Sequence, residues 1–541
     1  MPRRLWTGVG ALALGLALLA AAQLASASHG FRYGGTLQVG LTGASVQIDP
    51  QLAYSSTSWW LEYATALKLF NYPDRAGPPG SVLRPEAVSS YRVSRDGRTY
   101  TFSIKDHLHF SDGTPVNAES FAYAIDRAAN HELSSPAAPF ITDPSGTSIV
   151  GAKAVNNGRA THVRGVVAKG HRLVIHLTRR DPTFLTKLAM PFFQATSRLL
   201  PLTKEKVSSY PAAGPYSIIR NVPDVLTELR RNWHYRGSRP FRPDDVKVHW
   251  NLDEQKGYEQ VLAGTLDVGP LPDAEVRGVA DRYGVNKTRF WVEPLNCLGY
   301  LAMNANRPQF RSVALRRALN WAVNRRAALA LVPPYSGSPW THLLPPGYPG
   351  SATAARHRPY AGAPNLSKAR RLAAGHIRPG TVTVGYRSSS AGLAQAQLVR
   401  STLTAIGFKG DDVKLKGFTG ADLYDAMGKR NSDLDLGVGA GWCSDYPDPL
   451  GPFGAGLGFL DASTPGAARY RAKVAAAERL HGAARAKALG ELDVAIMNDL
   501  APVVVMRTYN NRYFLSSRIE PSSFRYQSVY EDWDIAALAL K

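Results

Sequence analysis

Cysteine is scarce in this sequence: Cys297 and Cys443 are the only two among 541 residues. Two cysteines alone cannot build a structural zinc site, which takes four ligands. Because no cysteine precedes position 297, none is available near the N-terminus for attachment of a lipid. We expect that the protein is not a lipoprotein and holds no metal, and nothing in the sequence predicts a cofactor.

Long apolar stretches are also missing beyond the N-terminus, and a membrane-spanning helix needs about 20 such residues. At the N-terminus two arginines precede an apolar stretch that runs to about residue 24, and Ala-Ser-Ala follows at 25–27. This order is typical of a secretory signal. We predict a signal peptide at residues 1–27 and a secreted or periplasmic mature protein. An uncleaved anchor is the alternative, because the apolar stretch is nearly long enough to span a bilayer.

Acidic residues are outnumbered, with 42 Asp and Glu against 64 Lys and Arg, for a formal net charge of +22. A basic protein can bind nucleic acid or an anionic surface. Here the basic residues are spread along the whole chain, and no basic helix or arm alternates with aromatic residues. We expect no nucleic-acid partner and some affinity for an acidic cell surface.

Catalytic motifs are absent as well. The sequence contains neither G-x-S-x-G nor H-E-x-x-H. The glycine-rich stretches at 437–442 and 454–459 do not complete a dinucleotide-binding fingerprint. His107 and His109 alternate on an expected strand, but two ligands are too few for a metal site. We predict that the protein is not an enzyme, with a secreted hydrolase as a disfavoured alternative.

What is present is a long chain of ordinary globular composition, 44% hydrophobic and 20% charged, with room for two or three domains. Tyr100, Phe102 and Ile104 alternate with polar residues as in a half-buried strand. Asn117 can cap a helix whose apolar positions recur at helical spacing. Mixed strands and helices predict an α/β protein. The other expected elements are strands at 34–40, 381–387 and 501–506, a strand followed by one long helix within 298–330, and helices at 391–406 and around 465–498.

One segment, GWCSDYPDPLGPF at 441–453, combines a rare cysteine with three prolines. Proline is excluded from helix interiors and central strands, so we predict a surface loop. In an oxidising compartment an isolated pair of cysteines favours a disulfide between Cys297 and Cys443. Two buried, unpaired cysteines are the alternative.

Three stretches carry a resemblance to a known family: SRDGRTYTFSIKDHLHFSDGTPVNAESFAYAIDR, AGPYSIIR…LRRNWHYRG and YLAMNANRPQFRSVALRRALNWAVNRR. In this order they resemble the large solute-binding proteins of ABC importers, in the oligopeptide, dipeptide and nickel family, over about residues 34–506. The resemblance implies a two-lobed periplasmic-binding-protein fold with a hinge and a cleft between the lobes. It also implies that the protein captures an oligopeptide or dipeptide and delivers it to permease subunits in the membrane. Another solute, such as a sugar or a metal chelate, is the alternative on the same fold.

The resemblance also implies roles for residues of the segment at 441–453, because GWCSDY is similar to the cleft loop of the oligopeptide-binding branch. It implies that Cys443 pairs with Cys297, that Asp445 binds the α-ammonium of a peptide, and that Trp442 lines a side-chain pocket. We add Tyr446 as a third ligand-binding candidate. The alternatives are a turn-forming role for Asp445 and core positions for Trp442 and Tyr446.

Three structural regions follow from the same resemblance, in a protein that we expect to be a monomer. The hinge is expected where the chain crosses between lobes, near 290–298 and 502–510. The expected regions are domain I at 28–52, 196–296 and 509–541, domain II at 53–195, and domain III at 297–508.

Overall fold

The computed structural model describes residues 31–143, 147–205, 207–429, 431–460 and 463–541. The signal peptide expected at 1–27 lies outside these residues. Within them, no helix has both the length and the apolar character needed to cross a membrane.

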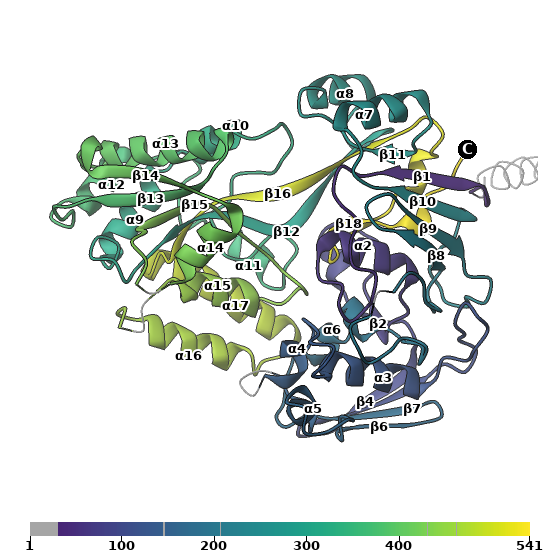
Figure 1. Cartoon of the computed structure of the whole chain (residues 1–541). Coiled ribbons are helices and arrows are strands. Elements are labelled where there is room, and N and C mark those ends of the chain that lie inside the picture. The colour runs from purple at the N-terminus through teal and green to yellow at the C-terminus, as the bar shows by residue number, and fades with distance from the viewer. Residues whose placement is uncertain (1–30, 144–146, 206, 430, 461–462) are drawn as a thin grey trace, which may run out of the picture.

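A mixed ten-stranded sheet runs through both lobes of the molecule (Figure 1). Two long strands, β12 (Phe290–Met303) and β16 (Val503–Leu515), pair antiparallel and extend from one lobe into the other. This confirms the two-lobed α/β fold that the resemblance implies. In spatial order the strands are β14 (Val413–Phe418), β13 (Val382–Arg387), β15 (Leu436–Cys443), β12, β16, β11 (Val268–Gly269), β1 (Thr36–Gly40), β10 (Asp245–His249), β9 (Leu226–Arg231) and β8 (Tyr216–Val222).

The first lobe contains the sheet from β11 to β8 and the C-terminal segment of the chain. Strand β1 lies where the sequence predicts it and pairs in parallel with β10. Its Leu37 and Val39 are fully buried in a core that also holds Trp533 and Leu538. Helices α2 (Ser56–Thr65), α7 (Glu254–Ala263) and α8 (Val276–Tyr283) pack beside this sheet, and β17 (Tyr526–Gln527) and β18 (Asp532–Trp533) form a short C-terminal hairpin.

A second unit packs against the first lobe and has its own four-stranded antiparallel sheet. Its strand β5 buries Tyr100, Phe102 and Ile104, as their alternation predicts. Asn117 caps helix α3 by accepting hydrogen bonds from backbone N–H groups of the first turn, again as predicted. The elements are β4 (Val88–Val93), β5 (Thr99–Ile104), β7 (Arg172–His176), β6 (Val166–Lys169), the pair β2 (Phe70–Asn71) and β3 (Arg84–Pro85), and helices α3 (Ala118–Ala129), α4 (Pro139–Thr142), α5 (Ala152–Asn156) and α6 (Phe184–Lys187).

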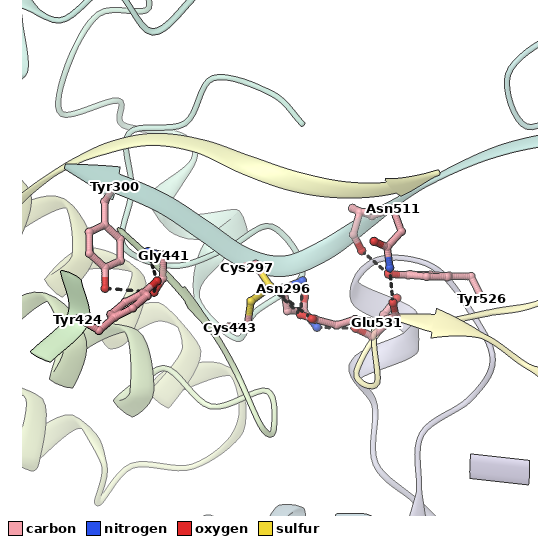
Figure 2. Close-up of a disulfide and its surroundings, with 11 residues drawn as sticks. Asn296, Cys297, Tyr300, Tyr424, Gly441, Cys443, Asn511, Tyr526 and Glu531 are labelled. Atoms are coloured by element: carbon pink, nitrogen blue, oxygen red, sulfur yellow. Dashed lines mark hydrogen bonds between the residues drawn. A yellow bond between two sulfur atoms is a disulfide. The ribbon is translucent and has the colours of Figure 1, made fainter. Parts of the chain in front are cut away.

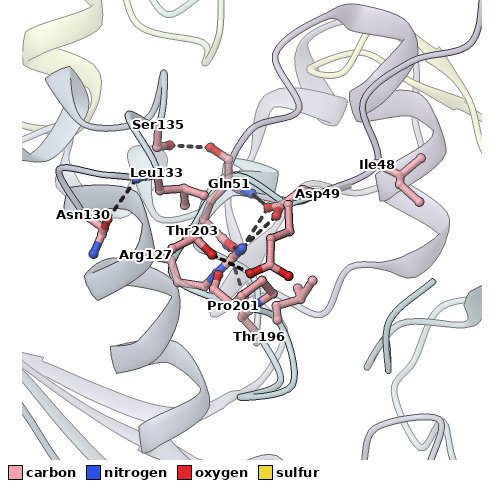
Figure 3. Close-up of polar contacts among 12 residues, drawn as sticks. Ile48, Asp49, Gln51, Arg127, Asn130, Leu133, Ser135, Thr196, Pro201 and Thr203 are labelled. Atoms are coloured by element: carbon pink, nitrogen blue, oxygen red, sulfur yellow. Dashed lines mark hydrogen bonds and ion pairs between the residues drawn. The ribbon is translucent and has the colours of Figure 1, made fainter. Parts of the chain in front are cut away.

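A buried ion pair ties this unit to the chain segments that enter and leave it (Figure 3). Arg127 of α3 donates to both carboxylate oxygens of Asp49, at 2.9 and 2.7 Å, and neither side chain is more than 1% exposed. Arg127 also donates to the side chain of Gln51 and to the carbonyl of Pro201. The guanidinium therefore holds together segments about 150 residues apart in the chain.

In the second lobe, helices cover both faces of the sheet formed by β14, β13, β15, β12 and β16. The expected strand at 381–387 and helix at 391–406 appear as β13 and α13. The helices are α9 (Val313–Ala322), α10 (Arg325–Ala330), α11 (Ser351–Ala354), α12 (Leu366–Ala373), α13 (Ser390–Ala405), α14 (Gly420–Gly428), α15 (Leu450–Gly458), α16 (Ala467–Ala477) and α17 (Gly482–Asp499).

The sequence predicted two long helices, and the structure divides each of them into two shorter helices. The helix expected within 298–330 ends at Ala322, and Asn324 then caps α10 with its side chain. The break lets Arg325 turn into the core, where it donates to the carbonyls of Trp340 and Val505. The stretch around 465–498 is likewise divided into α16 and α17.

Candidate functional site

The two cysteines face each other on neighbouring strands of the sheet (Figure 2). Cys297 of β12 lies directly opposite Cys443 of β15 in the strand register. Their Cα atoms are 4.2 Å apart and their sulfur atoms 2.00 Å apart, as in a disulfide. Cys297 is only 2% exposed, whereas Cys443 is exposed.

The segment at 441–453 is not a loop throughout, which corrects the expectation from its prolines. Gly441, Trp442 and Cys443 are the last residues of β15, and α15 begins at Leu450. Pro452 lies in the first turn of α15, where a backbone N–H has no partner within the helix and its loss costs little. Only residues 444–449 form a loop.

Asp445 borders a cavity of about 140 Å³ where three distant segments meet, at 54–59, 443–445 and 529–531. The hydroxyl of Tyr54 donates a 3.0 Å hydrogen bond to Oδ1 of Asp445. Burial raises the pKa of Asp445, and the hydrogen bond from Tyr54 lowers it in part. Within the described residues Asp445 has no ion pair with a basic side chain. Asp445 is thus a carboxylate that receives a hydrogen bond from a neutral hydroxyl, that of Tyr54.

Glu531 stands on another side of the same cavity, in the loop before β18. Its backbone adopts φ of 62°, in the left-handed region that a non-glycine residue rarely occupies. Its Oε1 accepts a 2.8 Å hydrogen bond from the backbone N–H of Asn296 (Figure 2). Burial raises the pKa of this carboxyl to about 8. The carboxyl therefore keeps its proton near neutral pH.

Trp442 lines a second, larger cavity of about 490 Å³, which Cys443 also borders. Cys443 thus lies between the two cavities. The Trp442 side chain is half-buried and also packs against the hydrophobic core on one face of the sheet, as its alternative role implied. Three arginines contribute to the lining of this cavity: Arg325, Arg387 and Arg507.

The larger cavity also includes an unpaired strand edge. Strand β13 pairs with β15 only as far as Val438, so 439–443 have a strand on one side only, β12. The backbone N–H of Gly441 donates to the hydroxyl of Tyr424 at 3.1 Å, and that hydroxyl donates to the carbonyl of Gly441 at 3.3 Å (Figure 2). The Tyr424 side chain therefore satisfies the backbone N–H and C=O groups of Gly441, to which a neighbouring strand could otherwise hydrogen-bond.

The structure places Tyr446 differently from the other two candidates. Its ring contacts Phe140 of the second unit edge to face, with centroids 6.3 Å apart, and Lys187 Nζ lies 5.8 Å from its centroid. Tyr446 is not among the residues that line either cavity. It thus joins the two lobes, and a role in ligand binding stays a prediction. Asp448, by contrast, is buried and pairs with Arg485 at 2.8 Å, as a structural residue would.

Sequence reasoning did not identify Tyr54, Glu531, Tyr424 or the three arginines as site residues. Tyr54 lies 391 residues from Asp445 in the sequence. The only local signal was composition: Tyr54 precedes an aromatic-rich helix, and Glu531 belongs to the acidic run Glu-Asp-Trp-Asp. Neither local composition indicates which distant residue Tyr54 or Glu531 contacts in the fold.

Comparison with known proteins identifies the family of this chain. The model of the bacterial extracellular solute-binding proteins, family 5, matches residues 82–458. The probable D,D-dipeptide-binding periplasmic protein DdpA of Escherichia coli K12 is 21% identical over 445 residues, 76% of this chain and 75% of that protein. The dipeptide-binding protein of the same organism is 25% identical over 357 residues, 62% of each chain.

Solved structures share the fold. The clavulanic acid biosynthesis oligopeptide binding protein 2 superposes with a TM-score of 0.79 at 23% identity, covering 94% of this chain and 96% of its own. The periplasmic murein tripeptide binding protein MppA, in its unliganded open form, gives 0.74 at 20% identity, with 95% and 99% covered. With the family model matching more than half of its length, the chain belongs to the bacterial extracellular solute-binding proteins of family 5, which bind solutes for import and are not enzymes.

Proposed function

We propose that this protein captures a short peptide with a free amino terminus in the cleft between its lobes and delivers it to an ABC importer. The observation that carries the proposal is the environment of Asp445. This carboxylate is half-buried, its burial raises its pKa, and within the described residues it has no basic partner. Closure of the cleft would bury it further, which is costly unless a cation pairs with it, and a peptide ammonium would supply that cation.

The size of the cavity beside Asp445 agrees with this role. At about 140 Å³ it is much smaller than the cavity of about 490 Å³ that Trp442 lines, so we propose that it takes only the amino-terminal end of the ligand. The remainder of the ligand would extend past Cys443 into the larger cavity of about 490 Å³, where Trp442 would contact its side chains.

The backbone of the ligand would then meet the open edge of β15. Side-chain and backbone directions alternate along a strand with a period of two, so the outward direction of Gly441 indicates that Cys443 presents backbone groups on the same side. The alternation stops at Gly439, whose φ is 78° and where the strand register shifts. An extended peptide can add there as a further strand, with the hydroxyl of Tyr424 displaced.

Basic groups in the larger cavity fit the opposite end of a peptide. Nη1 of Arg507 is buried without a hydrogen-bond partner in the described chain, and its guanidinium stacks 4.2 Å from the Tyr509 ring centroid. Arg387 ends β13 just before the N-terminus of α13. We propose that these arginines bind a terminal carboxylate, because guanidinium groups pair with carboxylates in two parallel hydrogen bonds.

Further expectations about the domains, the oligomeric state and the cysteines belong to the same proposal. The pairing of β12 with β16 between the lobes, whose register shifts between Pro294 and Leu298, supports a hinge near 290–298 and 502–510 and the three regions given above. We propose that closure brings the lobes together around the ligand. We further propose that the mature protein is a secreted monomer, without a lipid anchor or a nucleic-acid partner, and that its cysteines are oxidised.

Thermal unfolding with pooled short peptides tests the proposal. A ligand at about 100 times its Kd adds roughly 2.7 kcal/mol to the free energy of unfolding. We expect this shift with free peptides, its loss on N-acetylation, and its loss in Asp445→Asn. The matched control is Asp411→Asn, since Asp411 is exposed on the same lobe away from both cavities. If neither pool shifts the midpoint, the ligand is another solute, such as a sugar or a metal chelate.

A further inference from the structure

The two sulfur atoms of the Cys297–Cys443 pair lie in different surroundings. Cys443 is exposed at the end of β15 and borders both cavities of the cleft. Cys297 lies inside β12, is only 2% exposed and borders the larger cavity alone. Of the two cysteines, Cys443 is therefore the more accessible to a thiol that enters the cleft. A disulfide with only a structural role does not require such a position.

A carboxyl group lies against the buried sulfur (Figure 2). Oε1 and Oε2 of Glu531 are 3.5 and 3.3 Å from Sγ of Cys297. A disulfide sulfur carries no hydrogen, so only the carboxyl can supply a proton to this contact. Oε1 accepts from the backbone N–H of Asn296, which places the proton on Oε2, the oxygen nearer the sulfur. The raised pKa of Glu531 is consistent with a carboxyl that is protonated near neutral pH.

We infer that this disulfide is a thiol-exchange site: a cysteine-containing ligand in the cleft attacks Cys443, and Glu531 protonates the departing sulfur of Cys297. The ligand class is a thiol, such as a peptide with a cysteine side chain. This goes beyond reversible peptide capture and does not depend on it, because any small thiol that enters the cleft can react in the same way.

The exchange balances without an external oxidant. The ligand thiolate forms a bond to Sγ of Cys443 while the bond between Cys443 and Cys297 breaks, and the electron pair stays on Cys297. Oε2 of Glu531 transfers its proton to that thiolate, which leaves a Cys297 thiol and a Glu531 carboxylate. In the reverse step the carboxylate takes the proton back, Cys297 attacks Cys443, and the ligand thiol is released.

The proton donor matters because a buried thiolate has little solvation. Burial disfavours the charged form of a group, and a thiol that leaves as an unstabilised anion leaves slowly. Glu531 removes that barrier at the sulfur of the more buried cysteine. We therefore assign Glu531 as the acid of the exchange and Cys443 as the point of attachment.

Non-reducing mass spectrometry of the oxidised protein with the tripeptide Ala-Cys-Ala tests this inference. We expect one tripeptide attached through a disulfide to Cys443, with Cys297 open to alkylation, as peptide mapping would show. Ala-Ser-Ala should leave the mass unchanged. Attachment at Cys297, or no adduct while the native fold persists, would overturn the inference.

The role of Glu531 is tested by the rate of the same reaction. Glu531→Gln keeps the shape and the acceptor for Asn296 but has no acidic proton. Adduct formation should slow by about a hundredfold, in the range that a positioned acid contributes, and an unchanged rate would refute its role. Glu491→Gln, at an exposed position of α17, is the control. If Glu531→Gln does not fold, the attachment site in the unaltered protein still decides.

A small thiol separates this inference from the peptide proposal. 2-Mercaptoethanol has neither an ammonium nor a peptide backbone, so we expect it to form an adduct at Cys443 even if Ala-Ser-Ala does not stabilise the protein. Stabilisation by Ala-Ser-Ala without any thiol adduct would support peptide capture and reject the exchange.

Discussion

The hydroxyl of Tyr54 donates a 3.0 Å hydrogen bond to Oδ1 of Asp445 and so links the two lobes at the proposed ligand site. The Tyr54 ring is held by aromatic neighbours, with its centroid 5.9 Å from that of Trp59 and 5.5 Å from that of Phe192. A carboxylate has acceptor sites on two oxygens. Tyr54 can therefore orient Asp445 and still leave Oδ2 for a ligand ammonium.

Replacing Tyr54 by Phe should weaken peptide binding while keeping the ring contacts. One lost hydrogen bond is worth about 0.5–1.5 kcal/mol, so Kd should rise by roughly two- to tenfold. Calorimetric titration with one free peptide measures the change. Tyr91→Phe, at an exposed position of β4, should leave Kd unaltered. Tighter binding in Tyr54→Phe would mean that the hydroxyl competes with the ligand.

Asp448→Asn should reduce stability without reducing affinity. Asp448 Oδ2 pairs with Arg485 Nη2 at 2.8 Å, with the side chains 5% and 14% exposed. Removing one partner of a buried pair typically costs about 3–5 kcal/mol, because the other charge stays buried. Urea unfolding should show this loss, and titration of the folded variant should return the unaltered Kd. A large loss of affinity would instead place Asp448 in the binding site.

The ion pair of Asp49 and Arg127 should be important for holding the second unit on the first lobe. In Asp49→Asn the fully buried guanidinium loses its counter-charge, with an expected cost of about 3–5 kcal/mol. Urea unfolding measures the cost. In the double variant Asp49→Asn/Arg127→Met no buried charge is left, so its cost should be smaller than the sum of the two single costs. Simple additivity would show that the two side chains act independently.

The free energy of unfolding should fall as pH rises from about 4.3 to about 8. Burial raises the pKa of Glu531 to about 8 and that of Asp532 to about 7, whereas an unfolded Glu ionises near pH 4.3. Between these values the folded protein holds the extra proton, so higher pH favours the unfolded chain. Glu531 alone can contribute up to about 1.4 kcal/mol per pH unit.

Chemical unfolding at a series of pH values checks this dependence. Glu531→Gln should flatten the dependence of the free energy of unfolding on pH. Compared with the unaltered protein, the variant should therefore be more favoured at pH 8 than at pH 5. Glu491→Gln should follow the unaltered protein. A Glu531→Gln curve with the original slope would show that other groups cause the dependence.

Local features of the sequence were enough for much of the fold. The alternation of Tyr100, Phe102 and Ile104 sets which face of β5 is buried, and the side chain of Asn117 accepts hydrogen bonds from N–H groups two and three positions later. These interactions join residues a few positions apart, so the sequence alone displays them. The expectation of one long helix failed after Ala322, where Asn324 caps a new helix and Arg325 donates to the carbonyl of Val505, 180 residues away.

For the site, the sequence by itself determined the chemical types, a carboxylate, a tryptophan and two cysteines, and predicted that the cysteines pair. Only the tertiary structure decided what the other groups meet. The register of β12 and β15 brings Cys297 opposite Cys443, and lobe packing brings Tyr54 to Asp445 and Glu531 to the buried sulfur. Such contacts join residues 146 to 391 positions apart. They arise from the burial of whole surfaces, which no short stretch of sequence records.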